Sequence, residues 1–182
     1  MRKFELKRKV FHATVGLFFV FLVYVGAIES LGLLFPFDLF YFIPPLSRFL
    51  FLLLSGGLIL ILLSTRYEIS GLDWLLKNFE RTKDRKKFPG KGAFFYTLSA
   101  FILALFSGSD VLAASITILA VGDSFSPYIG KNFGKLKHPL SKRKKIEGNI
   151  VGGILGGLGA SLFIEPKIAI VASLVAMFVE GV

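Results

Sequence analysis

The chain has 182 residues, of which 54% are hydrophobic and 21 are phenylalanine, and this apolar content exceeds what a soluble domain of that length can bury. The formal net charge of +10 would favour a nucleic-acid partner, but the basic residues fall in short runs between long apolar stretches, so no nucleic acid is expected to bind. The absence of cysteine excludes disulfides, thiolate metal sites and cysteine nucleophiles.

The first half of the chain predicts two membrane-spanning helices separated by an interfacial segment. After a basic start, the apolar run from about Val10 to Ile28 is long enough to cross roughly 30 Å of hydrocarbon at about 1.5 Å per residue. It lacks the cleavage site of a signal peptide, and further apolar runs follow it. From Glu29 to Ser47 the chain is aromatic and broken by three prolines, which suits an interfacial or re-entrant stretch. The second helix is expected from Arg48 to Ser64.

The polar segment from Thr65 to Gly92 predicts an amphipathic helix on the membrane surface. Leu72, Leu75, Leu76 and Phe79 recur there with helical spacing, and basic residues accompany them. A helix of this kind lies in the plane of the interface with its apolar side toward lipid.

The second half of the chain predicts four more helices. They are expected at about Ala93–Phe106, Val111–Gly130, Asn149–Ile164 and from Ile168 to the end. The predicted fold is therefore all-α: a polytopic transmembrane helix bundle of about six helices plus the amphipathic cytoplasmic surface helix. We expect residues 1–182 to form a single integral membrane domain.

The distribution of basic residues predicts the orientation. Five Lys and Arg precede the first apolar run, eight lie in the 65–92 loop and seven in the 131–147 loop, whereas only Arg48 and Lys167 fall elsewhere. Short basic loops stay in the cytoplasm during insertion. The amino terminus and both loops are therefore expected to be cytoplasmic, and about half of these charges are expected to set topology alone.

Glycines mark one side of the fifth predicted helix. Gly148, Gly152 and Gly156 recur at four-residue steps, which predicts a smooth face against which another helix can pack closely. The sequence contains neither Gly-x-Gly-x-x-Gly nor P-loop spacing, so a conventional ATP-binding fold is not expected.

The strongest candidate for chemistry is Asp123, near the inner end of the fourth predicted helix. A carboxylate at membrane depth is costly and is a functional candidate by default. Ser124 and Ser126 lie beside it, and Pro127 is expected to kink or break the helix and expose backbone groups. One carboxylate beside phosphates and water suits Mg²⁺. The alternative is an ion pair between Asp123 and a Lys or Arg of a neighbouring helix.

A second cluster lies at the amino terminus. In a helix, Glu5, Arg8, Lys9, His12 and Gly16 share one face by their three- and four-residue spacings. His12 can then face a bound anion or an acid, although a single histidine at a helix end is more often an interfacial residue without a chemical role.

A third cluster precedes the glycine-rich helix. Lys144 belongs to a run of four cations, residues 142–145, that is followed by Glu147, and the cluster lies on the same predicted side of the membrane as Asp123. This cluster and Asp123 can therefore belong to one site.

Together the three clusters resemble the polyprenol and diacylglycerol kinase family, which includes dolichol kinase, phytol kinase and CTP-dependent diacylglycerol kinase. The family patterns are Arg-Lys-x-x-His-x-x-x-Gly, Gly-Asp-x-x-[small]-x-x-x-Gly-[Lys/Arg] and Lys-[Ser/Thr]-x-Glu-Gly, and they occur here in the family's order. The matched residues are Arg8, Lys9, His12 and Gly16, then Gly122, Asp123, Ser126, Gly130 and Lys131, then Lys144, Glu147 and Gly148. A looser match is Lys91-Gly92 before the third predicted helix.

The chain departs from the family patterns at three places. Lys145 stands where the family usually has a hydroxyl residue, and Ser126 stands where it most often has alanine. Family members usually continue into an Asp-Asn-Leu stretch and a final helix, whereas this sequence stops at Val182. A C-terminal helix of the family is therefore expected to be missing.

The resemblance implies transfer of the γ-phosphoryl group of CTP, or of ATP, to the hydroxyl of a membrane lipid alcohol such as a polyprenol or dolichol, a prenol or diacylglycerol. The residues fit that chemistry: Mg²⁺ is expected on Asp123 with help from Glu147, and the hydroxyl proton is expected to pass to His12 or to a carboxylate oxygen that does not bind the metal. The preference for CTP comes from the resemblance alone. The nucleotide-binding residues that the resemblance implies are Arg8, Lys9, Lys91, Gly122, Ser124, Ser126, Lys131 and Lys144.

Two other functions stay open at this point. A CTP-dependent cytidylyltransferase that makes a CDP-lipid would share the Mg²⁺ and the CTP but release pyrophosphate. A small non-enzymatic membrane transporter would use Asp123 and Glu180 as groups of an ion pathway.

Overall fold

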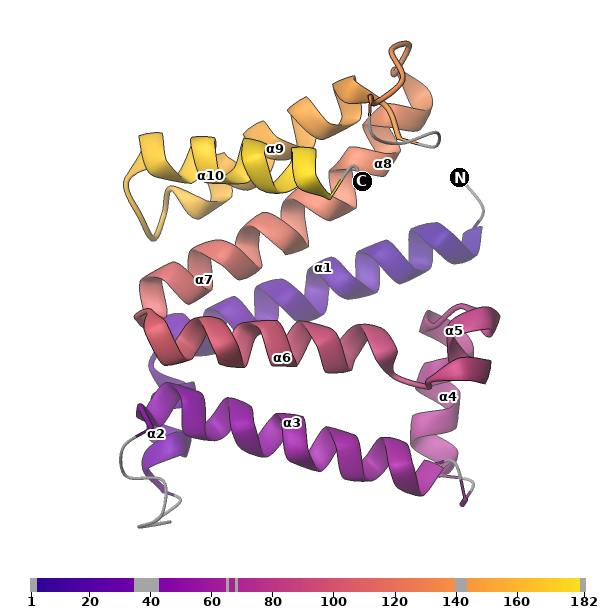
Figure 1. The fold of residues 1–182 in the computed structure, drawn as a ribbon, viewed down its shortest axis with the longest axis vertical. Coiled ribbons are helices and arrows are strands. Elements are labelled where there is room, and N and C mark those ends of the chain that lie inside the picture. The colour runs from indigo at the N-terminus through magenta and orange to yellow at the C-terminus, as the bar shows by residue number, and fades with distance from the viewer. Residues whose placement is uncertain (1–2, 35–42, 65, 68, 140–143, 181–182) are drawn as a thin grey trace. The chain divides into compact units, whose positions relative to one another are not determined.

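The computed structural model describes residues 3–34, 43–64, 66–67, 69–139 and 144–180 (Figure 1). Within these ranges the regular structure is helical, with ten α-helices and one π-helical turn. An isolated antiparallel bridge joins Lys137 and Lys145. The chain divides into two compact units, Met1–Tyr24 with Asp110–Val182 and Val25–Ser109. The predicted all-α class is confirmed.

The first unit contains the helices that carry most of the candidate residues. Its long helix α1 contacts the π-helical turn η2 and helix α8, and α9 contacts α8, η2 and α10. The bounds are α1 Lys3–Tyr24, α7 Ser109–Thr117, η2 Ile118–Gly122, α8 Asp123–Asn132, α9 Ile146–Ala160 and α10 Pro166–Val179.

Glycines allow α9 to approach its neighbours closely. A Cβ atom at Gly152 would lie 2.8 Å from the carbonyl oxygen of Gly122, and one at Gly156 would lie 2.8 Å from Oγ of Ser173. A Cβ atom at Gly148 would meet the backbone of α8. The predicted glycine face is confirmed as a packing surface, because any larger side chain would push the helices apart.

The second unit comprises residues 25–109. Helix α3 contacts both α2 and α6, and α4 has no fully buried residue, with Trp74 59% exposed. The helix predicted from the spacing of Leu72 to Phe79 does form, as α4. The bounds are α2 Ala27–Leu33, α3 Pro45–Ser64, α4 Ser70–Phe79, α5 Thr82–Lys87 and α6 Lys91–Phe106.

Two helices among the described residues are long and apolar enough to cross a membrane, namely Pro45–Ser64 and the continuous run Ser109–Asn132. A third is obtained if α1 and α2 count as one interrupted span. Gly26, whose φ of 70° lies in the left-handed region, stands at that interruption, so the helix expected from Val10 to Ile28 forms but ends at Tyr24, and the chain resumes as α2.

The other apolar helices are short. Helices α6 and α10 have 16 and 14 residues, which at about 1.5 Å per residue gives roughly 24 and 21 Å, less than the roughly 30 Å of a typical hydrocarbon core. Helix length therefore supports two or three spans, and six are not confirmed.

Candidate functional site

Pro127 leaves a backbone carbonyl in α8 without its usual helical donor. In an α-helix the N–H of residue 127 would donate to the carbonyl of Asp123, but proline has no N–H. The ammonium of Lys9 donates to that carbonyl oxygen at 2.9 Å. The helix continues through Pro127, so of the kink or break expected there the break does not occur, and the irregular part is the π-helical turn η2 immediately before Asp123.

The same ammonium of Lys9 also forms an ion pair with the carboxylate of Asp123. The two side chains are only 15% and 21% exposed. The hydroxyl of Ser124 donates to the backbone carbonyl of Lys9 at 3.4 Å. These contacts join α1 to the start of α8, so the ion pair that sequence analysis left as an alternative role for Asp123 is present.

The remaining residues of the amino-terminal cluster differ in their surroundings. Arg8 pairs with Glu5 on the same helix, with 2.9 Å between guanidinium nitrogen and carboxylate oxygen. His12 is exposed and lies within electrostatic range of Asp123, Lys9 and Arg8. Helix α1 therefore brings His12 and Lys9 to Asp123, while Arg8 is held by its neighbour one turn away.

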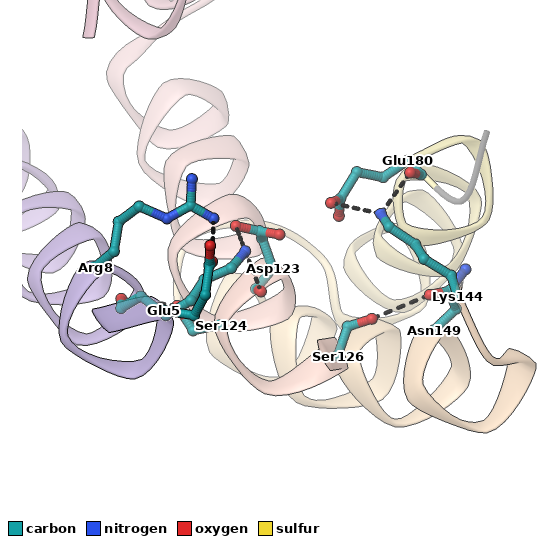
Figure 2. Close-up of polar contacts among 9 residues, drawn as sticks. Glu5, Arg8, Asp123, Ser124, Ser126, Lys144, Asn149 and Glu180 are labelled. Atoms are coloured by element: carbon teal, nitrogen blue, oxygen red, sulfur yellow. Dashed lines mark hydrogen bonds and ion pairs between the residues drawn. The ribbon is translucent and has the colours of Figure 1, made fainter. Parts of the chain in front are cut away.

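A second lysine–carboxylate pair is formed by Lys144 and Glu180. The ammonium of Lys144 donates to Oε1 of Glu180 at 2.8 Å and to the backbone oxygen of Glu180 at 2.5 Å. Glu180 immediately follows α10, where backbone carbonyls have no helical donor and a cation is favoured by the helix dipole. Figure 2 shows Lys144 reaching to the end of α10 to make both contacts.

The two ion pairs are electrostatically connected through their carboxyl groups. Burial raises the pKa of Glu180, the negative charge of Asp123 raises it further, and the contact with Lys144 opposes both effects. Lys9, Asp123, Glu180 and Lys144 thus form one cluster of alternating charge, hereafter the charge cluster. It draws on α1, α8, the segment before α9 and the residue after α10.

Glu180 is the site residue that the kinase prediction missed. Sequence analysis named it only for the transporter alternative. The signal that could have found it is an acidic residue directly after an apolar helix, because such a residue close to hydrocarbon is costly without a partner. That partner, Lys144, is 36 residues away and becomes visible only in the fold.

Glu147 anchors the loop before α9. Its Oε1 accepts the backbone N–H groups of Lys135 and Leu136, each at 2.8 Å. These bonds stabilise the carboxylate and lower the pKa of Glu147. The charged groups that act on Asp123 are Lys9, Glu180 and His12. In the described parts of the chain, the structure does not bring Glu147 into this set.

The described residues contain no group of three or more His, Asp or Glu side chains arranged to hold a metal ion. The predicted pairing of Asp123 and Glu147 around Mg²⁺ therefore remains a prediction. A site with one protein carboxylate, completed by phosphates and water, needs no such group.

Two further candidates take part in helix packing. The hydroxyl of Ser126 donates to Oδ1 of Asn149 at 3.0 Å, and both residues are buried between α8 and α9 (Figure 2). A Cβ atom at Gly122 would lie 2.9 Å from the sulfur of Met177. Ser126 therefore packs α8 against α9, and Gly122 lets η2 approach α10 closely. The two residues contribute in this way to the position of Asp123.

The last two candidates take no part in the described contacts of the charge cluster. Lys131 is exposed in the last turn of α8. Lys91 begins α6 in the second unit, where its ammonium lies 6.0 Å from the ring centroid of Phe95. Their predicted contacts with the nucleotide stay predictions.

Replacing Glu147 with Gln should speed amide hydrogen exchange at Lys135 and Leu136, because a neutral amide oxygen is a weaker acceptor than a carboxylate. The pKa of Glu147 is lowered in the folded state, so its stabilisation is present above the unfolded pKa and is lost as the pH falls through the folded pKa. Protection factors at both amides should therefore fall in the wild type as acid protonates Glu147, at a pH below the usual pKa of a glutamate.

The control for this experiment is Glu165→Gln, because Glu165 precedes α10 without a capping hydrogen bond from its side chain. It should leave both amides as protected as in the wild type. Unchanged protection in Glu147→Gln would show that the carboxylate does not hold the loop.

The charge cluster is thus the main candidate site, and its four residues come from four separate parts of the chain. Its lysines and carboxyl groups are chemically suited to phosphate and to a hard cation. Compared with family models, with curated proteins and with solved structures, the chain shows no significant match.

Proposed function

We propose that the protein is a membrane-embedded lipid kinase, which transfers the γ-phosphoryl group of CTP, or of ATP, to the hydroxyl of a lipid alcohol. The observation that carries the proposal is the charge cluster, in which the Lys9–Asp123 pair lies within electrostatic range of the Lys144–Glu180 pair. Phosphoryl transfer mainly needs positioned cations and a hard metal ion next to the phosphates. The resemblance of the three sequence patterns to the kinase family supports the same chemistry.

Asp123 fits a magnesium ion that is bound mainly through the nucleotide. Mg²⁺ uses one or two protein carboxylates and completes its coordination with phosphate oxygens and water. When bound, it would neutralise charge that develops on the phosphates. The Lys9 ammonium, which balances Asp123 in the structure, would then turn to a phosphate oxygen.

The proposed reaction is a direct transfer. The lipid hydroxyl oxygen forms a bond to the γ-phosphorus, the bond from that phosphorus to the bridging oxygen breaks, and the nucleoside diphosphate leaves with the electron pair. His12, within electrostatic range of Asp123, accepts the hydroxyl proton. Lys9 and Lys144 hold phosphate oxygens and offset their charge.

The proposed topology keeps the six spans of the sequence prediction, with the short helices α6 and α10 crossing a locally thinned bilayer. Single-cysteine variants can test it, because the chain contains no cysteine of its own. Lys77→Cys and Lys135→Cys should react with an impermeant maleimide only after the cells are opened. Asp110→Cys and Glu165→Cys should react in intact cells.

The location of the two basic loops on the same side of the membrane is the part of this topology that labelling tests most directly. Reaction of Lys77→Cys and Lys135→Cys from opposite sides of the membrane would rule the proposed orientation out, because both positions are predicted to be cytoplasmic.

The proposed function is tested by incubating the purified protein with Mg²⁺, CTP or ATP, and a panel of lipid alcohols that includes a polyprenol, a prenol and diacylglycerol. A kinase forms a phosphorylated lipid and a nucleoside diphosphate. A cytidylyltransferase would instead release pyrophosphate. Formation of neither product with any acceptor would contradict the proposal and favour the transporter alternative.

A further inference from the structure

The backbone of Lys144 is held by short-range pairing within the segment before α9. The N–H of His138 donates to the carbonyl oxygen of Lys144 at 3.1 Å, and the neighbouring residues Lys137 and Lys145 form an antiparallel bridge. These bonds fix where the Lys144 side chain starts. They leave its four rotatable bonds undetermined.

The end of α10 determines where the Lys144 side chain goes. Its ammonium contacts two acceptors that belong to one residue, the carboxylate and the backbone oxygen of Glu180. A flexible lysine side chain loses considerable rotational freedom when it is fixed in this way. A lysine fixed before a ligand binds loses less entropy on binding, which increases affinity.

The end of α10 is itself attached to the same segment. The rings of Phe178 and His138 lie with their centroids 4.8 Å apart, and the N–H of Glu180 donates to the carbonyl of Ala176 at 2.9 Å, which continues the last helical turn. Glu180 is therefore held in register with the segment that carries Lys144.

The contact between Lys144 and Glu180 also affects Asp123, whose carboxylate is a second possible partner for the Lys144 ammonium. Asp123 and Glu180 act on each other electrostatically, and each has its own lysine. A Lys144 side chain released from Glu180 would be attracted to Asp123. There it would compete with any cation that Asp123 binds and would move away from its position for binding phosphate.

We infer that Glu180 is a positioning residue, which holds Lys144 in place to bind nucleotide phosphate and keeps it from Asp123. This inference rests on the proposed function, because it assumes that the charge cluster binds a nucleoside triphosphate. On this inference Glu180, at the end of α10, affects how tightly the nucleotide binds and takes no direct part in the chemical step.

The test is to measure the Kd of CTP with Mg²⁺ and the steady-state kinetics of the full chain in detergent. Glu180→Gln should raise both Kd and KM for the nucleotide about tenfold and change kcat less than about threefold. Glu180→Asp, which keeps the charge, should recover part of the affinity. Glu165→Gln, at the other end of α10, should behave as the wild type.

A purely structural role predicts a different result, in which Glu180→Gln lowers the melting temperature while Kd and KM stay unchanged. That result would overturn the inference and leave the proposed function intact. A wild type that binds CTP without transferring its phosphoryl group would contradict the proposed function, and the inference would then be decided by Kd alone. A wild type that binds neither CTP nor ATP would overturn both.

Discussion

Asp123→Asn is expected to reduce phosphoryl transfer at least roughly 10³-fold while the protein stays folded. Asparagine keeps the shape of the side chain but removes the negative charge that Mg²⁺ requires. The fold should tolerate the change, because Lys9 keeps the backbone carbonyl of residue 123 as an acceptor at 2.9 Å. The melting temperature should therefore fall by only a few degrees, and both quantities can be measured on one preparation.

Asp110→Asn is the matched control for this variant. Asp110 is an exposed acid in the first turn of α7, near the other end of the continuous helix that contains Asp123. Its replacement should change neither activity nor melting temperature. Full activity of Asp123→Asn would contradict the site as proposed. If Asp123→Asn lowers stability but does not specifically lower turnover, the only role of Asp123 is to pair with Lys9.

Lys9→Met is expected to lower the free energy of unfolding by about 2 to 4 kcal/mol. The substitution leaves the largely buried Asp123 carboxylate without its cation, and it also leaves the carbonyl that Pro127 cannot satisfy without a donor. Lys131→Met is the control, because Lys131 is exposed on α8 and its loss should cost less than about 0.5 kcal/mol.

Pro127→Ala should suppress part of the Lys9→Met effect. Alanine at position 127 restores an N–H that can donate to the Asp123 carbonyl, so Lys9→Met should cost about 1 kcal/mol less in this background. A double-mutant cycle on chemical or thermal unfolding measures the coupling. Strict additivity of the two substitutions would show that Lys9 does not compensate for the proline.

The sequence predicted much of the helical structure, because apolar runs mark where helices lie. Helix α3 was expected from Arg48 to Ser64 and forms from Pro45 to Ser64, and α6 was expected from Ala93 to Phe106 and forms from Lys91 to Phe106. The start of α1 at Lys3 was not predicted, because its first turns are basic and hydropathy alone does not separate a charged helical turn from a loop.

Two backbone irregularities also escaped prediction. Gly26 interrupts an apolar run in which nothing else indicates a break. The π-helical turn Ile118–Gly122 lies in an uninterrupted apolar stretch, where the choice between α and π hydrogen bonding depends on the packing of neighbouring helices.

The candidate site was predicted where its residues belong to recognisable patterns, and missed where it depends on tertiary contacts. The patterns named Lys9, His12 and Asp123 as candidates and left open an ion pair of Asp123 with a Lys or Arg of a neighbouring helix, and the structure shows that pair with Lys9. Spacing could not show that Glu147 would accept backbone N–H groups, nor that Glu180 would meet Lys144, because both contacts depend on how loops close between distant segments.

The most direct test of the proposed lipid kinase is to follow the label of radioactive CTP or ATP into the lipid extract of vesicles that contain the purified protein, Mg²⁺ and a lipid alcohol. The account predicts that label in the γ-phosphate enters the lipid, that label in the α-phosphate does not, and that Asp123→Asn abolishes the transfer. Transfer of the α-label, or no transfer to any lipid alcohol from either nucleotide, would contradict it.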